Sequence, residues 1–215
     1  DWQALLGIDV RCPHLSWYTM QGEAKRDYPA SIFFQSAWWK DYKQVEDYFA
    51  RMHVLLHEGE QVSDTLVVHP IESVWCSVFP GWSRNLAGTT DQELKLEKHF
   101  ADLFGYLQGE QIDFDYGDEE MMSRLCAIER ENGRPVLRLG HARYRRVVVS
   151  GLTTIRSTTL NLLREFARQG GRVILAGEKP GYVDALAGDA SIQGALEIPF
   201  EPQALKQALS EARRI

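Results

Sequence analysis

Cysteine is scarce in this sequence of 215 residues, and the three thiols, Cys12, Cys76 and Cys126, lie far apart along the chain. An odd number of widely spaced cysteines argues against a disulfide framework. No Cys-x-x-Cys pair is present, so the cysteines suggest neither a structural zinc site nor a redox pair. We therefore expect reduced, mostly packed thiols, no metal site and no cofactor.

Long apolar runs and basic clusters are missing as well. No stretch approaches the roughly 20 apolar residues of a membrane helix, and no signal peptide is visible, so we expect a cytoplasmic protein without a membrane partner. The formal net charge is -6. Because nucleic-acid binding normally needs a basic patch, we expect no nucleic-acid partner.

The sequence also lacks the motifs that mark many α/β enzymes. The β-branched run Val147–Val149 predicts a strand buried on both faces of a parallel sheet, and the turn after it, Ser150–Arg156, is where such a sheet places its chemistry. That turn has no cysteine, no Gly-rich phosphate loop and no Gly-x-Ser-x-Gly elbow. Ser150 or Thr153 is a conceivable nucleophile, but no histidine follows His141, so we expect no general base there.

Other reactive arrangements are also disfavoured. The loop after the first predicted strand, 69–75, holds no glycine and contains Pro70, which cannot donate to a phosphate. Carboxylates able to flank a glycosidic bond are present, but those at 118–120 begin a predicted helix and favour its dipole, so we interpret the group as structural. The candidates are Glu72, Asp113, Asp115, Glu119 and Glu120.

From residue 64 onward, predicted strands and helices alternate. This pattern is typical of a doubly wound, flavodoxin-like parallel sheet with strand order 2-1-3-4-5. The strands are expected at Asp64–His69, Ile112–Tyr116, Val147–Val149, Arg172–Gly177 and Ala195–Ile198. Helices are expected after the capping box Thr90–Glu93 and at Asp118–Cys126, Thr153–Gln169 and Pro202–Arg214. A long aromatic loop is expected at Ile71–Gly88, and a hairpin around Asn132-Gly133.

The front of the chain has a different character. Leu5–Val10 predicts a single strand that needs partners, and Tyr42–Glu58 predicts an amphipathic helix ended by Gly59. Five of the six tryptophans precede Cys76, which suggests that this region meets a ligand or another domain. Aromatic faces with a few polar anchors bind sugar rings, so the aromatic surroundings make His14 a candidate ligand contact.

Short motifs in the first 80 residues resemble parts of glycoside hydrolases. Gly7–Tyr18, Gly22–Asp27 and Trp38-Trp39 resemble the final barrel strand and following loop of some bacterial enzymes, and Tyr42–Glu58 is similar to the helix that leaves such a (β/α)8 barrel. Ser63–Trp75 resembles the opening strand and loop of the class I glutamine amidotransferase-like domain of family 42 β-galactosidases. Large α-L-rhamnosidase-type hydrolases have related arrangements.

The resemblance implies that residues 1–60 are the end of a catalytic barrel and that 61–215 form an amidotransferase-like domain, of the trimerisation type, without catalysis of its own. The catalytic carboxylates would then lie before Asp1, and this chain alone would be inactive. It would support assembly, compatible with a homo-oligomer, and the rim of a site for an oligosaccharide or glycoside. His14, Tyr18 and Trp39 would line that sugar site.

Two alternatives stay open. One is a stand-alone module that binds carbohydrate or a protein partner through its Trp-rich loops. The other is an amidotransferase-like enzyme that uses Ser150 or Thr153 as nucleophile. A thiol, an imidazole or a metal ion beside Ser150 would overturn the expectation of an empty site.

Overall fold

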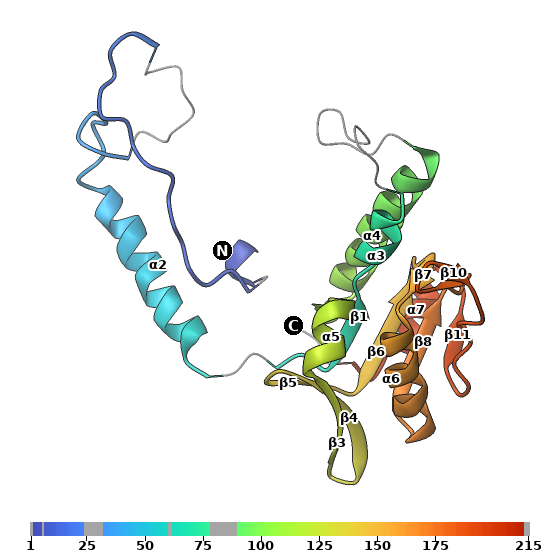
Figure 1. Cartoon of the computed structure of the whole chain (residues 1–215). Helices are drawn as coiled ribbons and strands as arrows, with labels where there is room; N and C mark the ends of the chain where they lie inside the picture. Colours follow the sequence, from blue (N-terminus) through green and yellow to red (C-terminus); the bar gives the residue numbers. More distant parts are fainter. Residues whose placement is uncertain (1, 6, 24–31, 60–61, 78–89, 213–215) are drawn as a thin grey trace. The chain divides into compact units, whose positions relative to one another are not determined.

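The structure is a computed structural model of the chain and describes residues 2–5, 7–23, 32–59, 62–77 and 90–212. The chain divides into two compact units, Asp1–Gln61 and Val62–Ile215, called unit 1 and unit 2 below. Figure 1 draws unit 1 in blue to cyan and unit 2 from teal to red. Within the described residues, no helix combines the length and the apolar character needed to cross a membrane.

A five-stranded parallel sheet forms the centre of unit 2 (Figure 1). Its strands lie in the order β2-β1-β6-β8-β11, and every neighbouring pair is parallel. In sequence order these are strands 2-1-3-4-5, as predicted, so the α/β assignment with a parallel sheet is confirmed. The strands are β1 (Thr65–Val68), β2 (Asp115–Gly117), β6 (Arg146–Ser150), β8 (Arg172–Ala176) and β11 (Leu196–Ile198).

Helices pack on both faces of this sheet. Val147 and Val149 of β6 join a buried cluster with residues of α5 and α6, whereas Val148 joins a second cluster with residues of α4 and α7. Because successive side chains of a strand point to opposite faces, the unbroken valine run supplies both layers. The helices are α4 (Asp91–Gly109), α5 (Glu119–Leu125), α6 (Ser157–Arg168) and α7 (Pro202–Ala208).

Side-chain caps fix where α4 and α5 begin. Thr90 Oγ1 accepts a hydrogen bond from the Glu93 amide at 3.2 Å, and the Glu93 carboxylate accepts one from the Thr90 amide at 3.0 Å. This reciprocal pair is the predicted capping box, which satisfies amide groups that have no partner inside the helix. Asp118 caps α5 in a similar way, accepting from the Met121 amide at 2.9 Å.

The predicted hairpin is confirmed and extended by a third strand. β3 (Cys126–Glu131) and β4 (Arg134–Leu139) pair antiparallel around Asn132 and Gly133, whose φ angles are 50° and 79°. Two positive φ angles in a two-residue turn suit the right-handed twist of the flanking strands. β5 (Ala142–Tyr144), which has no counterpart among the predicted strands, pairs with β4.

One predicted helix start in unit 2 was wrong. The helix expected from Thr153 begins only at Ser157, because residues 154–155 form the short strand β7, paired with β9 (Tyr182–Val183). The hydroxyl of Ser73 accepts hydrogen bonds from the amides of Thr153 and Thr154 and holds this stretch out of the helix. β9 also pairs with β10 (Leu186–Ala187).

Helix ends and loops account for the other differences. The expected loop Ile71–Gly88 begins with the short helix α3 (Ile71–Trp75), and its residues 78–88, including Phe79 and Trp82, lie outside the described residues. α7 ends at Ala208, before the expected Arg214.

The three cysteines are not all packed. Burial raises the pKa of Cys126 to about 11, but Cys12 and Cys76 are exposed, so the expectation of mostly packed thiols was wrong.

Unit 1 contains α1 (Trp2–Leu5) and α2 (Tyr42–His57). The predicted amphipathic helix is thus confirmed, and Gly59 has the positive φ, 99°, expected just after a helix end. The strand expected at Leu5–Val10 was wrong, because the described residues 7–10 follow α1 as a turn and an irregular segment. A strand needs a paired neighbour, and none of the described strands pairs with this segment.

Candidate functional site at the carboxyl edge of the sheet

The carboxyl edge of the parallel sheet is the place where this architecture positions chemistry. β1 pairs with β2 on one side and with β6 on the other, so the chain changes direction across the sheet at the β1–β6 pair. Ser150 is the last residue of β6, and it is only 3% exposed. The turn that follows, 151–156, is therefore the candidate site.

A histidine lies against this serine. His99 of α4 places Nε2 2.8 Å from Ser150 Oγ. The expectations that Ser150 has no base beside it and that the site is empty were therefore both wrong. The imidazole comes from α4, which precedes β6 in the sequence, and not from the residues after Ser150.

The hydrogen bonds of Ser150 decide what this pair can do. Ser150 Oγ donates to the backbone carbonyl of Ala176, the residue beside it on β8, at 2.8 Å. A hydroxyl has one proton, so while Ser150 donates to Ala176 the contact with His99 has Nε2–H donating to Oγ. A general base must instead accept the hydroxyl proton. In this arrangement His99 donates a hydrogen bond to Ser150 Oγ, so it does not remove the hydroxyl proton and does not activate the serine as a nucleophile.

The imidazole also fills the space above the turn. A Cβ atom added to Gly151, which has a φ of 70°, would lie 2.4 Å from His99 Cδ2. The ring also stacks on Phe200, with centroids 3.6 Å apart and planes inclined by 20°. Glycine at position 151 is thus required both by the backbone conformation and by the close approach of the ring.

Burial lowers the pKa of His99 below its ordinary value, an effect that the nearby Asp102 opposes. The neutral imidazole is therefore favoured, with one ring nitrogen protonated and the other able to accept. A neutral, stacked ring suits a packing role. A neutral imidazole is also the form that a general base needs, so protonation state alone does not separate the two roles.

Three backbone amides of the turn, those of Thr153, Thr154 and Arg156, already donate to side chains of the protein. Ser73 Oγ accepts from the amides of Thr153 at 2.9 Å and Thr154 at 3.2 Å, and Glu119 accepts from the amide of Arg156 at 2.8 Å. Stabilising an oxyanion requires amide donors that point at the reacting oxygen. These three donors point at side chains instead, so they are not available to stabilise an oxyanion.

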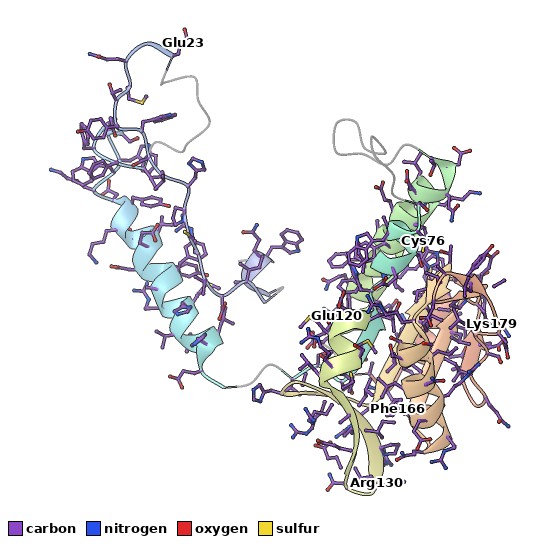
Figure 2. All side chains as sticks on the ribbon, in the orientation of Figure 1. Glu23, Cys76, Glu120, Arg130, Phe166 and Lys179 are labelled. Carbon is purple, nitrogen blue, oxygen red and sulfur yellow. The ribbon has the colours of Figure 1, made fainter. Side chains whose placement is uncertain are left out.

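An ion pair and a cavity lie next to the turn. Arg156 contacts the Glu72 carboxylate through Nε at 2.7 Å and Nη2 at 2.5 Å. Both residues line a cavity of about 440 Å³ together with Cys76, the residue that follows α3 and is labelled in Figure 2. Burial raises the pKa of Glu119, an effect that the hydrogen bond from the Arg156 amide opposes. The ion pair lines this cavity, whereas Ser150 does not.

The carboxylates considered for glycosidic chemistry have structural partners. Asp115 accepts from the Tyr144 hydroxyl at 2.9 Å, and Glu120 forms a two-pronged contact with Arg124 one helical turn away. Glu72 and Glu119 hold Arg156 as described above, and Asp113 also has a partner. The structural interpretation of these carboxylates therefore agrees with the geometry of unit 2.

The residues predicted to line a sugar site lie in unit 1. Tyr18 is 98% exposed, Trp39 is 37% exposed and packs edge-on against Phe33 with centroids 5.8 Å apart. His14 is exposed, and its Nδ1 lies 3.0 Å from the Leu15 carbonyl. A cavity of about 540 Å³ in unit 1 is lined by other residues, from α1, the segment 8–12 and α2. Their role in sugar binding stays a prediction.

No family model and no curated protein matches this sequence. Two solved structures show a weak likeness. A catalytic mutant of Gan42B, a GH42 β-galactosidase from G. stearothermophilus, has a TM-score of 0.46 at 14% identity, and Gan42B itself has a TM-score of 0.43 at 15% identity. Each comparison covers 73% of this chain and 19% of the other chain. At these TM-scores the likeness carries no argument about function.

A sequence signal for the missed histidine does exist. The buried residues of α4 include Leu96, Leu103 and Leu107. His99 lies three residues after the first and four before the second, on the face that packs against the sheet. Helical spacing therefore indicates that His99 faces inward, although it does not indicate which strand end the ring reaches.

Proposed function

We propose that this chain is the C-terminal part of a bacterial glycoside hydrolase. In this proposal, residues 1–60 come from the end of a catalytic (β/α)8 barrel, and 61–215 form an amidotransferase-like domain without catalysis of its own. The domain supports assembly, in a homo-oligomer, and contributes to the rim of a site for an oligosaccharide or glycoside. The parent enzyme acts in the cytoplasm and binds no nucleic acid.

The closed carboxyl edge of unit 2 is the observation that supports the proposal most directly. Ser150 donates to a backbone carbonyl, His99 and Phe200 fill the space above the turn, and the turn amides at Thr153 and Thr154 are bonded to Ser73. A non-catalytic domain can have a carboxyl edge that its own side chains occupy, because no substrate has to bind there. An enzyme would need a free nucleophile and an open oxyanion position.

Two features of the front of the chain support the barrel assignment. The motifs between Gly7 and Trp75 resemble those of family 42 β-galactosidases and related hydrolases. α2 carries apolar residues at helical spacing but buries none of them within the described chain. A helix of this kind requires apolar cover, which the adjoining parts of a barrel would provide.

Hydrolysis of aryl glycosides tests the proposal. The 215-residue chain should release no product, whereas a longer protein that includes the preceding barrel should turn over. In that longer protein, alanine at His14, Tyr18 or Trp39 should raise KM or lower kcat. Alanine at Tyr182, an exposed tyrosine of unit 2, is the matched control and should change neither. Turnover by the 215 residues alone would contradict the proposal.

The pair formed by His99 and Ser150 favours a second candidate, an acyl-transfer enzyme, because the atoms lie at hydrogen-bond distance. That function requires Ser150 to rotate its proton from Ala176 to Nε2. Esterase or glutaminase activity that disappears in both Ser150→Ala and His99→Gln would establish it and would displace the non-catalytic proposal.

The exposed aromatic side chains of unit 1 keep a third candidate open, a stand-alone binding module. Trp2 and Trp38 are exposed, as is Tyr18. Titration of the chain with oligosaccharides, followed by tryptophan fluorescence, separates this candidate from the first. A saturable change would favour the module, whereas the C-terminal part of a hydrolase should respond little on its own.

A further inference from the structure

Two histidines and one aspartate converge in unit 1. One candidate ligand atom from each of Asp9, His53 and His57 lies within 4.8 Å of the other two. Asp9 and His53 are partly buried, and His57 is exposed. All three belong to unit 1, so the cluster depends only on the packing of the segment 8–12 against α2.

Helical spacing accounts for the two imidazoles. His53 and His57 are four residues apart on α2, and side chains at that spacing lie on one face, one above the other. Their rings stack with centroids 5.1 Å apart and planes inclined by 28°. A histidine pair at this spacing presents two ring nitrogens in the same direction, which is the arrangement that many helical metal sites use.

The aspartate holds both rings in place. His53 Nδ1–H donates to the Asp9 backbone carbonyl at 3.0 Å, and His57 Nδ1 lies 3.1 Å from the Asp9 carboxylate. A carbonyl can only accept, so the first bond leaves Nε2 of His53 with its lone pair available. Such a bond to a backbone carbonyl is how proteins commonly orient a metal-binding histidine.

Arg11 fixes the segment that carries Asp9. Its guanidinium contacts the Glu46 carboxylate at 2.8 Å and the Tyr42 hydroxyl, and it lies over the Phe49 ring at 4.6 Å from the centroid. These three partners are on α2. Asp9 lies two residues before Arg11. It is thereby held against a later part of the same helix, at His53 and His57.

The distances suit a transition-metal ion. Nitrogen and oxygen ligands bind zinc at about 2.0–2.2 Å, so two ligands of a tetrahedral ion lie roughly 3.3–3.6 Å apart. The separation of 3.1 Å between His57 Nδ1 and the Asp9 carboxylate is close to that value. An ion would replace the shared proton, and a modest movement of the His53 ring would complete a three-ligand set.

We propose that Asp9, His53 and His57 form a binding site for a divalent transition-metal ion, with Zn²⁺ as the best match. Two imidazoles and one carboxylate suit zinc, and three protein ligands leave a fourth position for water. Asp9 and His53 also line the 540 Å³ cavity of unit 1, so the fourth position adjoins that space. The ion would bind the segment 8–12 to α2. This inference goes beyond the proposed function and does not depend on glycosidase activity.

Equilibrium dialysis of the 215-residue chain against Zn²⁺, followed by elemental analysis, tests the site. We expect one tightly bound ion per chain. His53→Ala and His57→Ala should abolish this binding. Alanine is the best helix-forming residue, so neither change should unfold α2, and circular dichroism checks this. His141→Ala, which removes an exposed histidine of unit 2, is the matched control and should bind as the unaltered chain does.

Asp9→Asn separates a three-ligand site from a simple histidine pair. Loss of even an outer-shell partner weakens metal binding by about 10- to 100-fold, so loss of a ligand should weaken it by at least that much. Binding that Asp9→Asn leaves unchanged would overturn the three-ligand site, as would an unaltered chain that binds no Zn²⁺.

Hydrogen exchange gives a second, independent readout. Zn²⁺ should slow the exchange of amides in the segment 8–12 in the unaltered chain, because the ion joins this segment to α2. It should have no such effect in His53→Ala. Equal exchange with and without Zn²⁺ in a chain that binds the ion would contradict the proposed ligand set.

Discussion

The helices α2 and α6 carry similar apolar patterns, but the apolar face of α6 is buried and that of α2 is not. Both place apolar residues three and four positions apart, as amphipathic helices do. α6 buries Leu160, Leu163 and Phe166 against the parallel sheet, and Figure 2 labels Phe166 there. α2 buries none of its residues. The pattern therefore predicts a helix and its apolar face, but it does not identify the surface that covers this face.

Apolar segments also behave differently in the two units, because a strand needs neighbours just as an apolar helix face needs cover. β6 has paired neighbours on both sides, so its amides and carbonyls are satisfied, and its valines are at most 3% exposed. The segment Leu5–Val10 is also apolar, yet its described residues form no strand because no described strand pairs with it. Pairing, rather than composition, decides which apolar segment becomes a strand.

Matched leucine substitutions should give the largest contrast. Leu163→Ala empties a site that is 0% exposed in unit 2, and the lost burial and cavity should lower the free energy of unfolding by about 2–5 kcal/mol. Leu55→Ala changes a residue of α2 that is 76% exposed and should stay within about 0.5 kcal/mol of zero. Denaturant unfolding followed by circular dichroism measures both. Equal losses would mean that α2 has a core after all.

Two glycine substitutions test whether His99 covers the turn after β6, and they should change the free energy of unfolding less than Leu163→Ala does. Gly133→Ala places a Cβ at a φ of 79° in open space, and strain of about 1 kcal/mol is expected. Gly151→Ala has a similar φ, and its Cβ would also displace the His99 ring, so the loss should be larger, about 2–3 kcal/mol. Thermal unfolding compares the two variants. An equal loss would indicate that the ring does not lie over the turn.

The pH dependence contributed by His99 should be the smallest effect. Burial lowers its pKa in the folded protein, so below its ordinary value of 6.5 the unfolded chain takes up a proton more readily than the folded one. The free energy of unfolding should therefore fall as the pH falls through this range. In His99→Gln this part of the slope should disappear, while the part due to His69, whose pKa burial also lowers, remains. An unchanged slope would show that His99 is solvated.

Much of unit 2 could be predicted from local signals. The valine run predicted a strand buried on both faces, the Thr90–Glu93 capping box predicted the start of α4, and Asn132-Gly133 predicted the hairpin turn. Each of these signals acts through neighbouring residues or through the period of one element. The strand order followed because right-handed crossovers leave few arrangements.

Contacts between distant segments could not be predicted in this way. Ser73 holds residues 153–154 extended from 80 positions away in the sequence. As a result α6 begins at Ser157 and not at Thr153, where the helix was predicted to begin. His99 reaches Ser150 across 51 positions, and the Asp9 pair with His57 spans 48. Such contacts depend on how finished elements pack, and no local pattern in the sequence encodes them.

Labelling of Ser150 by a fluorophosphonate probe tests the central claim most directly. Such probes react with serines that a neighbouring base activates. If the Ser150 proton is held by Ala176 and the turn is closed by His99, mass spectrometry of the 215-residue chain should find Ser150 labelled no faster than the surface serine Ser123. Rapid labelling of Ser150 that is lost in His99→Gln would contradict a non-catalytic unit 2.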